Sequence, residues 1–109
     1  MNRISLLTAL CLVALLGCGQ PSPRPVALSD LAANAASYKG QQLRLEGTVQ
    51  FFSPPAHAWI EDNALNRVEL LPLDAVSEYV GQQVSVTGTF DVGDGRGRRL
   101  RVEQITPIE

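Results

Sequence analysis

The sequence predicts an all-β domain with short helices, in which five strands pair in an antiparallel arrangement. Five segments alternate apolar and polar residues with the period of a half-buried strand, and clusters of glycine, proline, aspartate and asparagine separate them. A short helical segment interrupts the series after the third strand. Roughly eighty residues follow a proline-rich stretch, which is enough chain for one hydrophobic core and too little for two.

Each strand is expected where apolar and polar residues alternate, and each turn where proline, glycine or asparagine gather. The first strand, near residues 43–51, carries Leu43, Leu45 and Val49 on one face. Ser53-Pro54-Pro55 then turns the chain, and the segment Gly93–Gly97 forms a later hairpin turn. The other expected elements are helices at 29–38 and 74–80 and strands at 57–61, 67–71, 84–92 and 99–105.

One segment of the chain is repeated. Residues 38–49 match residues 79–90 at an offset of 41, with six of twelve positions identical. In each copy the end of a helix leads through a glycine into a strand with a second glycine at its centre. Gly40 and Gly81 suit the left-handed residue that ends a helix, and Gly47 and Gly88 predict a bulge or a sharp bend.

This order of elements, with the motif G-x-x-φ-x-φ-x-G-x-φ (φ apolar) in both copies, resembles the OB-fold, a small five-stranded Greek-key barrel. The resemblance covers residues 38–109 and includes bacterial OB-fold proteins and the domains that resemble tRNA-anticodon-binding proteins. It implies a long first strand that bends at its glycine and serves both sheets of the barrel. We therefore expect an OB-fold domain over residues 28–109.

Residues 1–17 have the parts of an export signal. Arg3 is basic, and the apolar run from Ile4 to Leu16 has 13 residues, well short of the ~20 that span a membrane. Leu15-Leu16-Gly17-Cys18 resembles the lipobox of bacterial lipoproteins. That resemblance implies cleavage after Gly17, a diacylglycerol on Cys18 and acylation of the new amine, palmitate being the usual acyl chain. The alternative is a simple secretory signal beside a chance cysteine.

Lipidation would fix the location of the protein. Gly19 stands where lipoproteins retained in the inner membrane usually have aspartate, so the resemblance implies the periplasmic face of the outer membrane. In a cell without an outer membrane it implies the outer face of the cytoplasmic membrane. Residues 18–27 carry three prolines and predict an extended tether of about 3.1 Å per residue. Cys11 leaves with the signal and Cys18 is lipidated, so no disulfide is expected.

Catalytic chemistry is not expected from this sequence. His57 is the only histidine, and one imidazole beside Glu61 and Asp62 is an incomplete metal site. No serine or cysteine has a base at a recognisable spacing, and Gly93–Gly97 separates two strands, where a phosphate-binding loop would open a helix. We therefore predict a protein that is not an enzyme and that uses neither metal nor cofactor.

A binding surface is the better prediction. The arginines at 96, 98, 99 and 101 are the main concentration of charge. Once Arg3 is removed, eight basic and eleven acidic side chains remain, and this net charge of −3 argues against nucleic acid as a partner. The leading hypothesis is an assembly module that binds an envelope protein; the alternative is a binder of an oligosaccharide, a polyamine or another solute. The candidate contact residues are His57, Trp59, Arg67, Glu69, Arg96, Arg98 and Arg99.

Overall fold

The computed structural model describes residues 22–109. The expected export signal and Cys18, the expected site of lipidation, lie outside the described residues. Within residues 22–109 the chain is mostly β-strand with two short α-helices, and no helix there is long and apolar enough to cross a membrane. The elements are β1 (Arg24–Pro25), α2 (Leu28–Asn34), η1 (Ala35–Tyr38), β2 (Gln42–Phe52), β3 (His57–Glu61), β4 (Arg67–Leu71), α3 (Leu73–Val76), η2 (Ser77–Tyr79), β5 (Gln83–Gly93) and β6 (Gly97–Pro107), where η marks a 3₁₀ turn.

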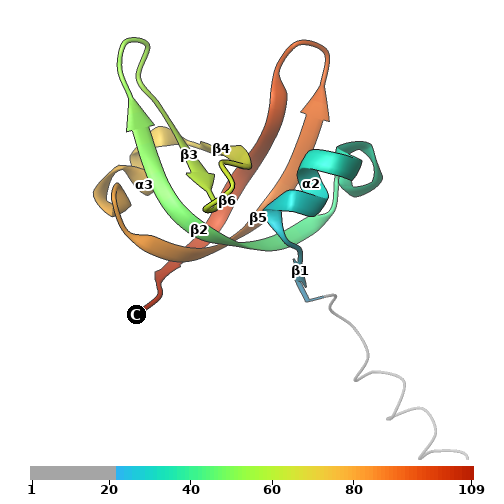
Figure 1. The fold of residues 1–109 in the computed structure, drawn as a ribbon, viewed down its shortest axis with the longest axis horizontal. Helices are drawn as coiled ribbons and strands as arrows, with labels where there is room; N and C mark the ends of the chain where they lie inside the picture. The colour runs from blue at the N-terminus through green and yellow to red at the C-terminus, as the bar shows by residue number, and fades with distance from the viewer. Residues whose placement is uncertain (1–21) are drawn as a thin grey trace, which may run out of the picture.

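The described strands form one sheet in the order β1-β2-β3-β4-β6-β5, and a further pairing of β2 with β5 closes the circuit (Figure 1). The expectation that all strands pair antiparallel is wrong, because β4 and β6 are parallel, with Glu69 opposite Arg99. The direction follows from the connections. β5 runs antiparallel to β2, and β6 runs antiparallel to β5, so β6 runs in the same direction as β2 and β4.

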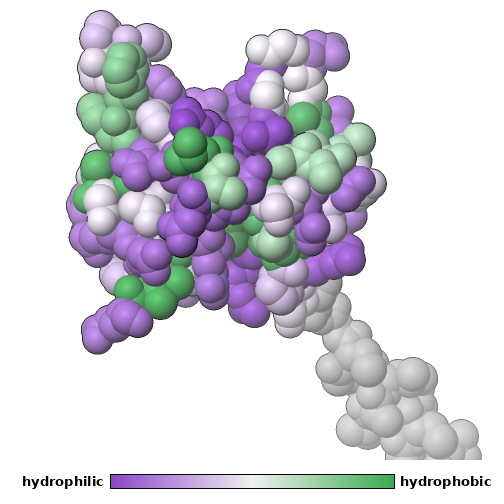
Figure 2. Space-filling view, in the orientation of Figure 1, coloured by the Kyte–Doolittle hydropathy of each residue, from purple (hydrophilic) through white to green (hydrophobic). Residues whose placement is uncertain are grey.

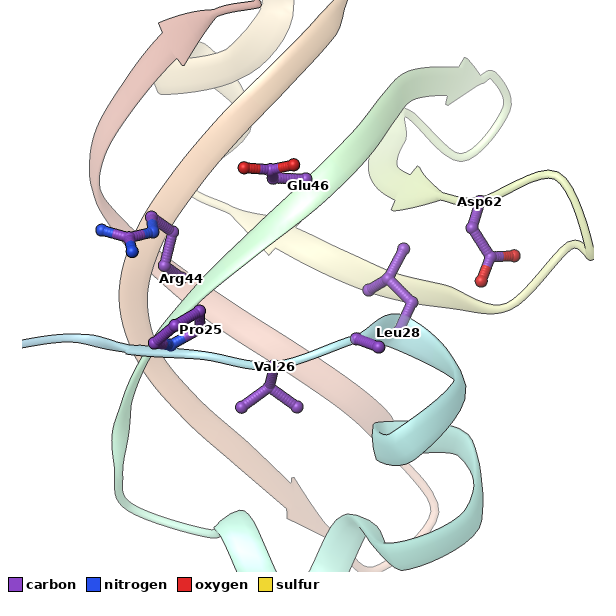
Figure 3. A pocket seen from close by; sticks show the side chains of 7 residues that line it. Pro25, Val26, Leu28, Arg44, Glu46 and Asp62 are labelled. Carbon is purple, nitrogen blue, oxygen red and sulfur yellow. The ribbon is translucent and has the colours of Figure 1, made fainter.

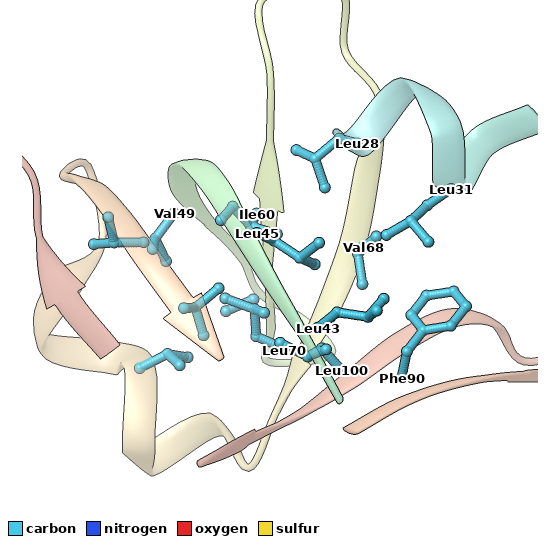
Figure 4. Packing of buried hydrophobic residues seen from close by; sticks show 14 residues of the cluster. Leu28, Leu31, Leu43, Leu45, Val49, Ile60, Val68, Leu70, Phe90 and Leu100 are labelled. Atoms are coloured by element: carbon cyan, nitrogen blue, oxygen red, sulfur yellow. The ribbon is translucent and has the colours of Figure 1, made fainter. Parts of the chain in front are cut away.

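The core fills the space that this circuit encloses. Alternate residues of every long strand point inward, so Leu43, Leu45 and Val49 of β2 are completely buried, as the alternation of β2 predicts. Burial of each such side chain contributes about 1.5–3 kcal/mol. Leu28 and Leu31 of α2 close one end of the core, and Figure 4 shows them packed over the strands. The remaining members of the core are Ala58, Ile60, Val68, Leu70, Val76, Val84, Val86, Phe90 and Leu100.

The repeated segments are related by an approximate two-fold axis. Leu45 pairs with Val86, its own equivalent in the second copy, at the centre of the β2–β5 ladder. Gly40 and Gly81 both have a left-handed φ, at 82° and 88°, which confirms the predicted role of these glycines. Each glycine then donates a backbone hydrogen bond to the strand of the other copy: Gly40 N to Phe90 O at 2.7 Å, and Gly81 N to Val49 O at 2.8 Å.

The two hairpins that follow the repeats project from the same side of the sheet. Figure 1 shows β2–β3 and β5–β6 rising together, with β1 and the carboxyl terminus on the opposite side. The helices are shorter than predicted, since α2 ends at Asn34 and α3 at Val76, and a 3₁₀ turn follows each. Each 3₁₀ turn ends two residues before the left-handed glycine, Gly40 or Gly81.

Part of the expected tether lies against the domain. Arg24 and Pro25 form β1, which pairs in parallel with β2, and Val26 N donates to Arg44 O at 3.1 Å. The Arg24 guanidinium lies 5.5 Å from the centre of the Tyr38 ring. Contacts with the domain thus begin at Arg24, inside the segment 18–27.

Asp62 organises the turn between β3 and β4, and its replacement by alanine is expected to destabilise the domain by about 1 kcal/mol at neutral pH. Its carboxylate accepts hydrogen bonds from Ala64 N at 3.0 Å, Asn66 N at 2.9 Å and Asn66 Nδ2 at 2.9 Å. The bond from the Asn66 side chain is the main cause that lowers the pKa of Asp62. Neighbouring Leu65 adopts a left-handed φ of 67° in this turn.

The pH dependence follows from that direction. Because the pKa of Asp62 is lower in the folded state than in the unfolded chain, its carboxylate stabilises the domain fully at pH values above the unfolded-state pKa. This stabilisation is lost as the pH falls through the folded-state pKa. The difference in unfolding free energy between the wild type and Asp62→Ala is therefore expected to shrink below about pH 4. Urea unfolding at pH 7 and pH 3 measures it. An equal difference at both pH values would contradict this account.

Candidate binding surface

The outward face of β2, β3, β4 and β6 carries polar and aromatic side chains in transverse rows. One row runs from Gln50 through Trp59 and Glu69 to Arg99, each residue paired with the next across neighbouring strands. The adjacent row on one side begins with Phe52 opposite His57, and the row on the other side places Glu61 opposite Arg67. Ala58 and Ile60 point the other way into the core, as the alternation of β3 predicts.

Aromatic rings stack along β3. The His57 ring lies 5.2 Å from the Trp59 ring with an interplanar angle of 31°, and Phe52 contacts His57 edge-on at 5.9 Å. The Arg67 guanidinium lies 4.7 Å from the centre of the Trp59 ring. His57 precedes Trp59 by two residues, and Arg67 pairs with Glu61, two residues after it. The indole therefore has two neighbours from this same chain, His57 and Arg67.

Glu61 fixes the orientation of this stack. Its carboxylate accepts hydrogen bonds from Trp59 Nε1 at 2.9 Å and Gln50 Nε2 at 3.3 Å, and it forms an ion pair with Arg67 at 3.5 Å. The Glu61 side chain is 15% exposed and that of Arg67 is 52% exposed. An exposed ion pair contributes little by itself, but three partners on one carboxylate hold the indole in one position. The sequence pattern suggests for Glu61 only the role of a metal ligand, and this role in orienting Trp59 depends on the folded structure.

A hollow of about 280 Å³ lies beside the stack, and we call it the first hollow. Arg98 contributes to its wall and donates from Nε to the Arg67 carbonyl at 3.2 Å, which joins the β5–β6 hairpin to β4. Six of the seven candidate residues line the first hollow, together with Gly97: His57, Trp59, Arg67, Glu69, Arg96 and Arg98.

Arg99, the seventh candidate, lines a different hollow. It ends the outward row that contains Trp59 and Glu69, but it forms an ion pair with Asp91 of the next strand, β5, at 3.9 Å. It lines a neighbouring hollow of about 340 Å³, the second hollow, together with Lys39, Gly40, Leu71, Thr89, Phe90, Asp91 and Arg101. Lys39 was not among the residues predicted from the sequence. It lines the second hollow because the chain after η1 bonds to β5.

A third hollow, of about 460 Å³, lies between β1, the start of α2 and the outward face of β2. Figure 3 shows Arg44 and Glu46 pointing in different directions along β2, with Asp62 on the far rim. Two carboxylates and one guanidinium that do not converge give this hollow no consistent charge. Its size alone therefore does not make it the site.

The tips of the two hairpins differ in chemistry. Phe51 is 42% exposed and Phe52 is 54% exposed at the end of β2, beside Pro54 and Pro55. Figure 2 shows hydrophobic colour on the β2–β3 tip and neutral to hydrophilic colour on the β5–β6 tip, with a notch between them. The first hollow therefore lies near an apolar projection on one side and a basic hairpin on the other. Such a surface can bind carboxylates through guanidinium donors.

No family model matches this chain, and no curated protein matches it. Solved structures do. The chain matches Replication protein A of U. maydis, solved with ssDNA, at a TM-score of 0.59 and 22% identity, over 84% of this chain and 77% of that one. It matches the hypothetical protein ygiW of E. coli at a TM-score of 0.55 and 12% identity, over 82% of this chain and 100% of that one.

A third similar structure is a provisionally assigned aspartyl-tRNA synthetase from Leishmania major Friedlin, at a TM-score of 0.55 and 12% identity. The match covers 84% of this chain, which spans only 22% of that protein. At such low identities these similarities concern the fold alone. Together with the strand order, they support the OB-fold that the sequence resembles.

Proposed function

We propose that this protein is a lipid-anchored, non-enzymatic binding module of the bacterial envelope, built on a Greek-key OB barrel, and that the first hollow binds an acidic segment of a partner protein. The observation that carries the proposal is that three arginines, Arg67, Arg96 and Arg98, line one hollow of a chain whose net charge is negative. Guanidinium groups bind carboxylates with charge-assisted, often bidentate hydrogen bonds.

The arrangement of Trp59 favours a peptide over a nucleic acid or a sugar. Single-stranded nucleic acids bind such folds by stacking bases on free aromatic faces, and Replication protein A has ssDNA bound. Here the Trp59 ring already contacts the His57 ring and the Arg67 guanidinium. The stack therefore serves as a rigid apolar wall, against which the stems of bound side chains can pack.

The proposed anchor is compatible with this site. The lipobox would place lipid on Cys18, and the described chain begins on the side opposite the two hairpins (Figure 1). A tether entering there would leave the hairpins and the first hollow accessible from the periplasm. The proposed location is the periplasmic face of the outer membrane.

Charge reversal of the first hollow tests the proposed function. The variant Arg96→Glu/Arg98→Glu is expected to lose capture of its partner at least tenfold when envelopes are cross-linked and the protein is recovered. The physical reason is that two donors become repulsive charges at the centre of the contact. Quantitative mass spectrometry of the recovered partners measures the loss.

Arg24→Glu/Arg44→Glu is the matched control, because it makes the same change of charge outside the first hollow. It is expected to capture the partner normally. Equal capture by all three proteins would rule out the first hollow as the contact surface. Ligand-dependent quenching of Trp59 by a solute, with no protein captured, would favour the small-ligand alternative.

A further inference from the structure

The basic residues of this protein gather on one band of its surface. Eight lysine and arginine side chains follow Cys18. Six of them line the first or the second hollow: Arg67, Arg96 and Arg98 in the first, and Lys39, Arg99 and Arg101 in the second. Of the eleven acidic side chains, only Glu69 and Asp91 line either hollow. The band is therefore basic, even though Glu61 pairs with Arg67 and the chain as a whole is acidic.

The two hollows adjoin each other. Glu69 lines the first and Arg99 the second, and these residues are register partners on neighbouring strands. The same register continues from Arg99 to Asp91 on β5. The two hollows thus occupy successive stretches of one outward face, from β3 across β4 and β6 to β5.

The length of this band sets the length of a ligand that fills it. Three steps between neighbouring strands, at about 4.8 Å each, separate β3 from β5. An extended polypeptide advances about 3.3 Å per residue, so about five residues span the distance. A peptide of three residues can occupy one hollow only.

The second hollow can accept carboxylates. Leu71 and Phe90 are among the residues that line it, and Lys39, Arg99 and Arg101 supply its positive charge. Arg99 and Asp91 form a long ion pair, at 3.9 Å, and the Asp91 side chain is 53% exposed. An incoming carboxylate can therefore compete for the Arg99 guanidinium at little cost.

We propose that the first and second hollows form one continuous track, which binds a single extended acidic polypeptide across β3, β4, β6 and β5. This inference rests on the proposed function and extends it, because it adds a second contact site and the chemistry and minimum length of the ligand. Contact along the whole track makes binding depend on ligand length as well as on charge.

Peptides of defined length test the track. Fluorescein-labelled tri-glutamate and deca-glutamate are titrated with the full chain in detergent, and anisotropy is followed at about 0.15 M salt, where charges beyond ~8 Å are screened. Deca-glutamate is expected to bind at least tenfold more tightly than tri-glutamate. The variants Arg96→Glu/Arg98→Glu and Arg99→Glu/Arg101→Glu are each expected to weaken deca-glutamate binding at least tenfold.

The control Arg24→Glu/Arg44→Glu makes the same change of charge outside the track and is expected to change the affinity less than threefold. Thermal unfolding by circular dichroism checks that each variant is folded. If only Arg96→Glu/Arg98→Glu weakens binding, the track is overturned and the proposed function stands. If neither track variant weakens binding, both are overturned. Tighter binding of labelled deca-thymidylate or of an oligogalacturonate than of deca-glutamate would overturn the acidic polypeptide as the ligand.

Discussion

Replacing Gly88 with alanine is expected to destabilise the domain by about 3 kcal/mol, the upper end of the usual cost of overpacking. A Cβ at this position would lie 2.1 Å from the Arg101 carbonyl oxygen and 2.8 Å from its carbon. The register between β5 and β6 shifts between Thr87 and Gly88, so the backbones approach most closely where the ladder is irregular. Because the obstructing atoms belong to backbone, β6 itself must move.

Thermal unfolding measures this effect. For a domain of this size, 1 kcal/mol corresponds to about 4–8 °C in Tm, so Gly88→Ala is expected to lower Tm by more than 10 °C. Gly47→Ala, the equivalent change in the first repeat, places its Cβ 2.6 Å from the Glu61 carbonyl oxygen and is expected to cost less. Gly93→Ala is the control, because a Cβ there meets no atom within 4 Å. Equal Tm values for all three variants would contradict the close approach at Gly88.

Local patterns predicted the strands well, because each pattern reflects which side chains face the core. The expected bounds of β3 and β4 match the structure at both ends. The parallel pairing of β4 with β6 was not predictable from such patterns, since it depends on how α3 returns the chain to the far side of the sheet. The two residues of β1 escaped prediction because a proline-rich segment carries no strand pattern.

The candidate surface was predicted only in part, because alternation shows which side chains share a face of one strand but not which strands lie together. His57 and Trp59 share a face of β3 by alternation, so their joint exposure could be expected. Arg98 and Arg99 line different hollows, because Arg98 bonds to the Arg67 carbonyl of β4 whereas Arg99 pairs with Asp91 of β5; these partners depend on the tertiary structure. Lys39 is about sixty residues from Arg99 in the sequence, and only the tertiary structure brings them together.

Replacing Cys18 with serine is expected to abolish acylation of the protein completely. The thiol is the group to which the diacylglycerol would be attached through a thioether, and a serine hydroxyl cannot form that bond. Each buried methylene contributes about 0.8 kcal/mol of membrane affinity, so two or three acyl chains hold a protein stably. Labelling of cells with an alkyne palmitate analogue, followed by in-gel fluorescence, measures the loss.

Cys11→Ser supplies a control within the same chain. Cys11 is expected to leave with the signal segment, so this variant should keep its full label. Label retained in Cys18→Ser, or lost in Cys11→Ser, would contradict the proposed lipobox.

The anchor and the binding surface are also expected to act independently. Purified Cys18→Ser protein should bind deca-glutamate as the wild type does, because the first and second hollows lie on the folded domain beyond the tether. In cells, however, the same variant should capture less partner, since membrane attachment raises the effective concentration of two proteins that share a surface. A weaker affinity of the purified variant would instead mean that the lipidated segment contributes directly to the contact.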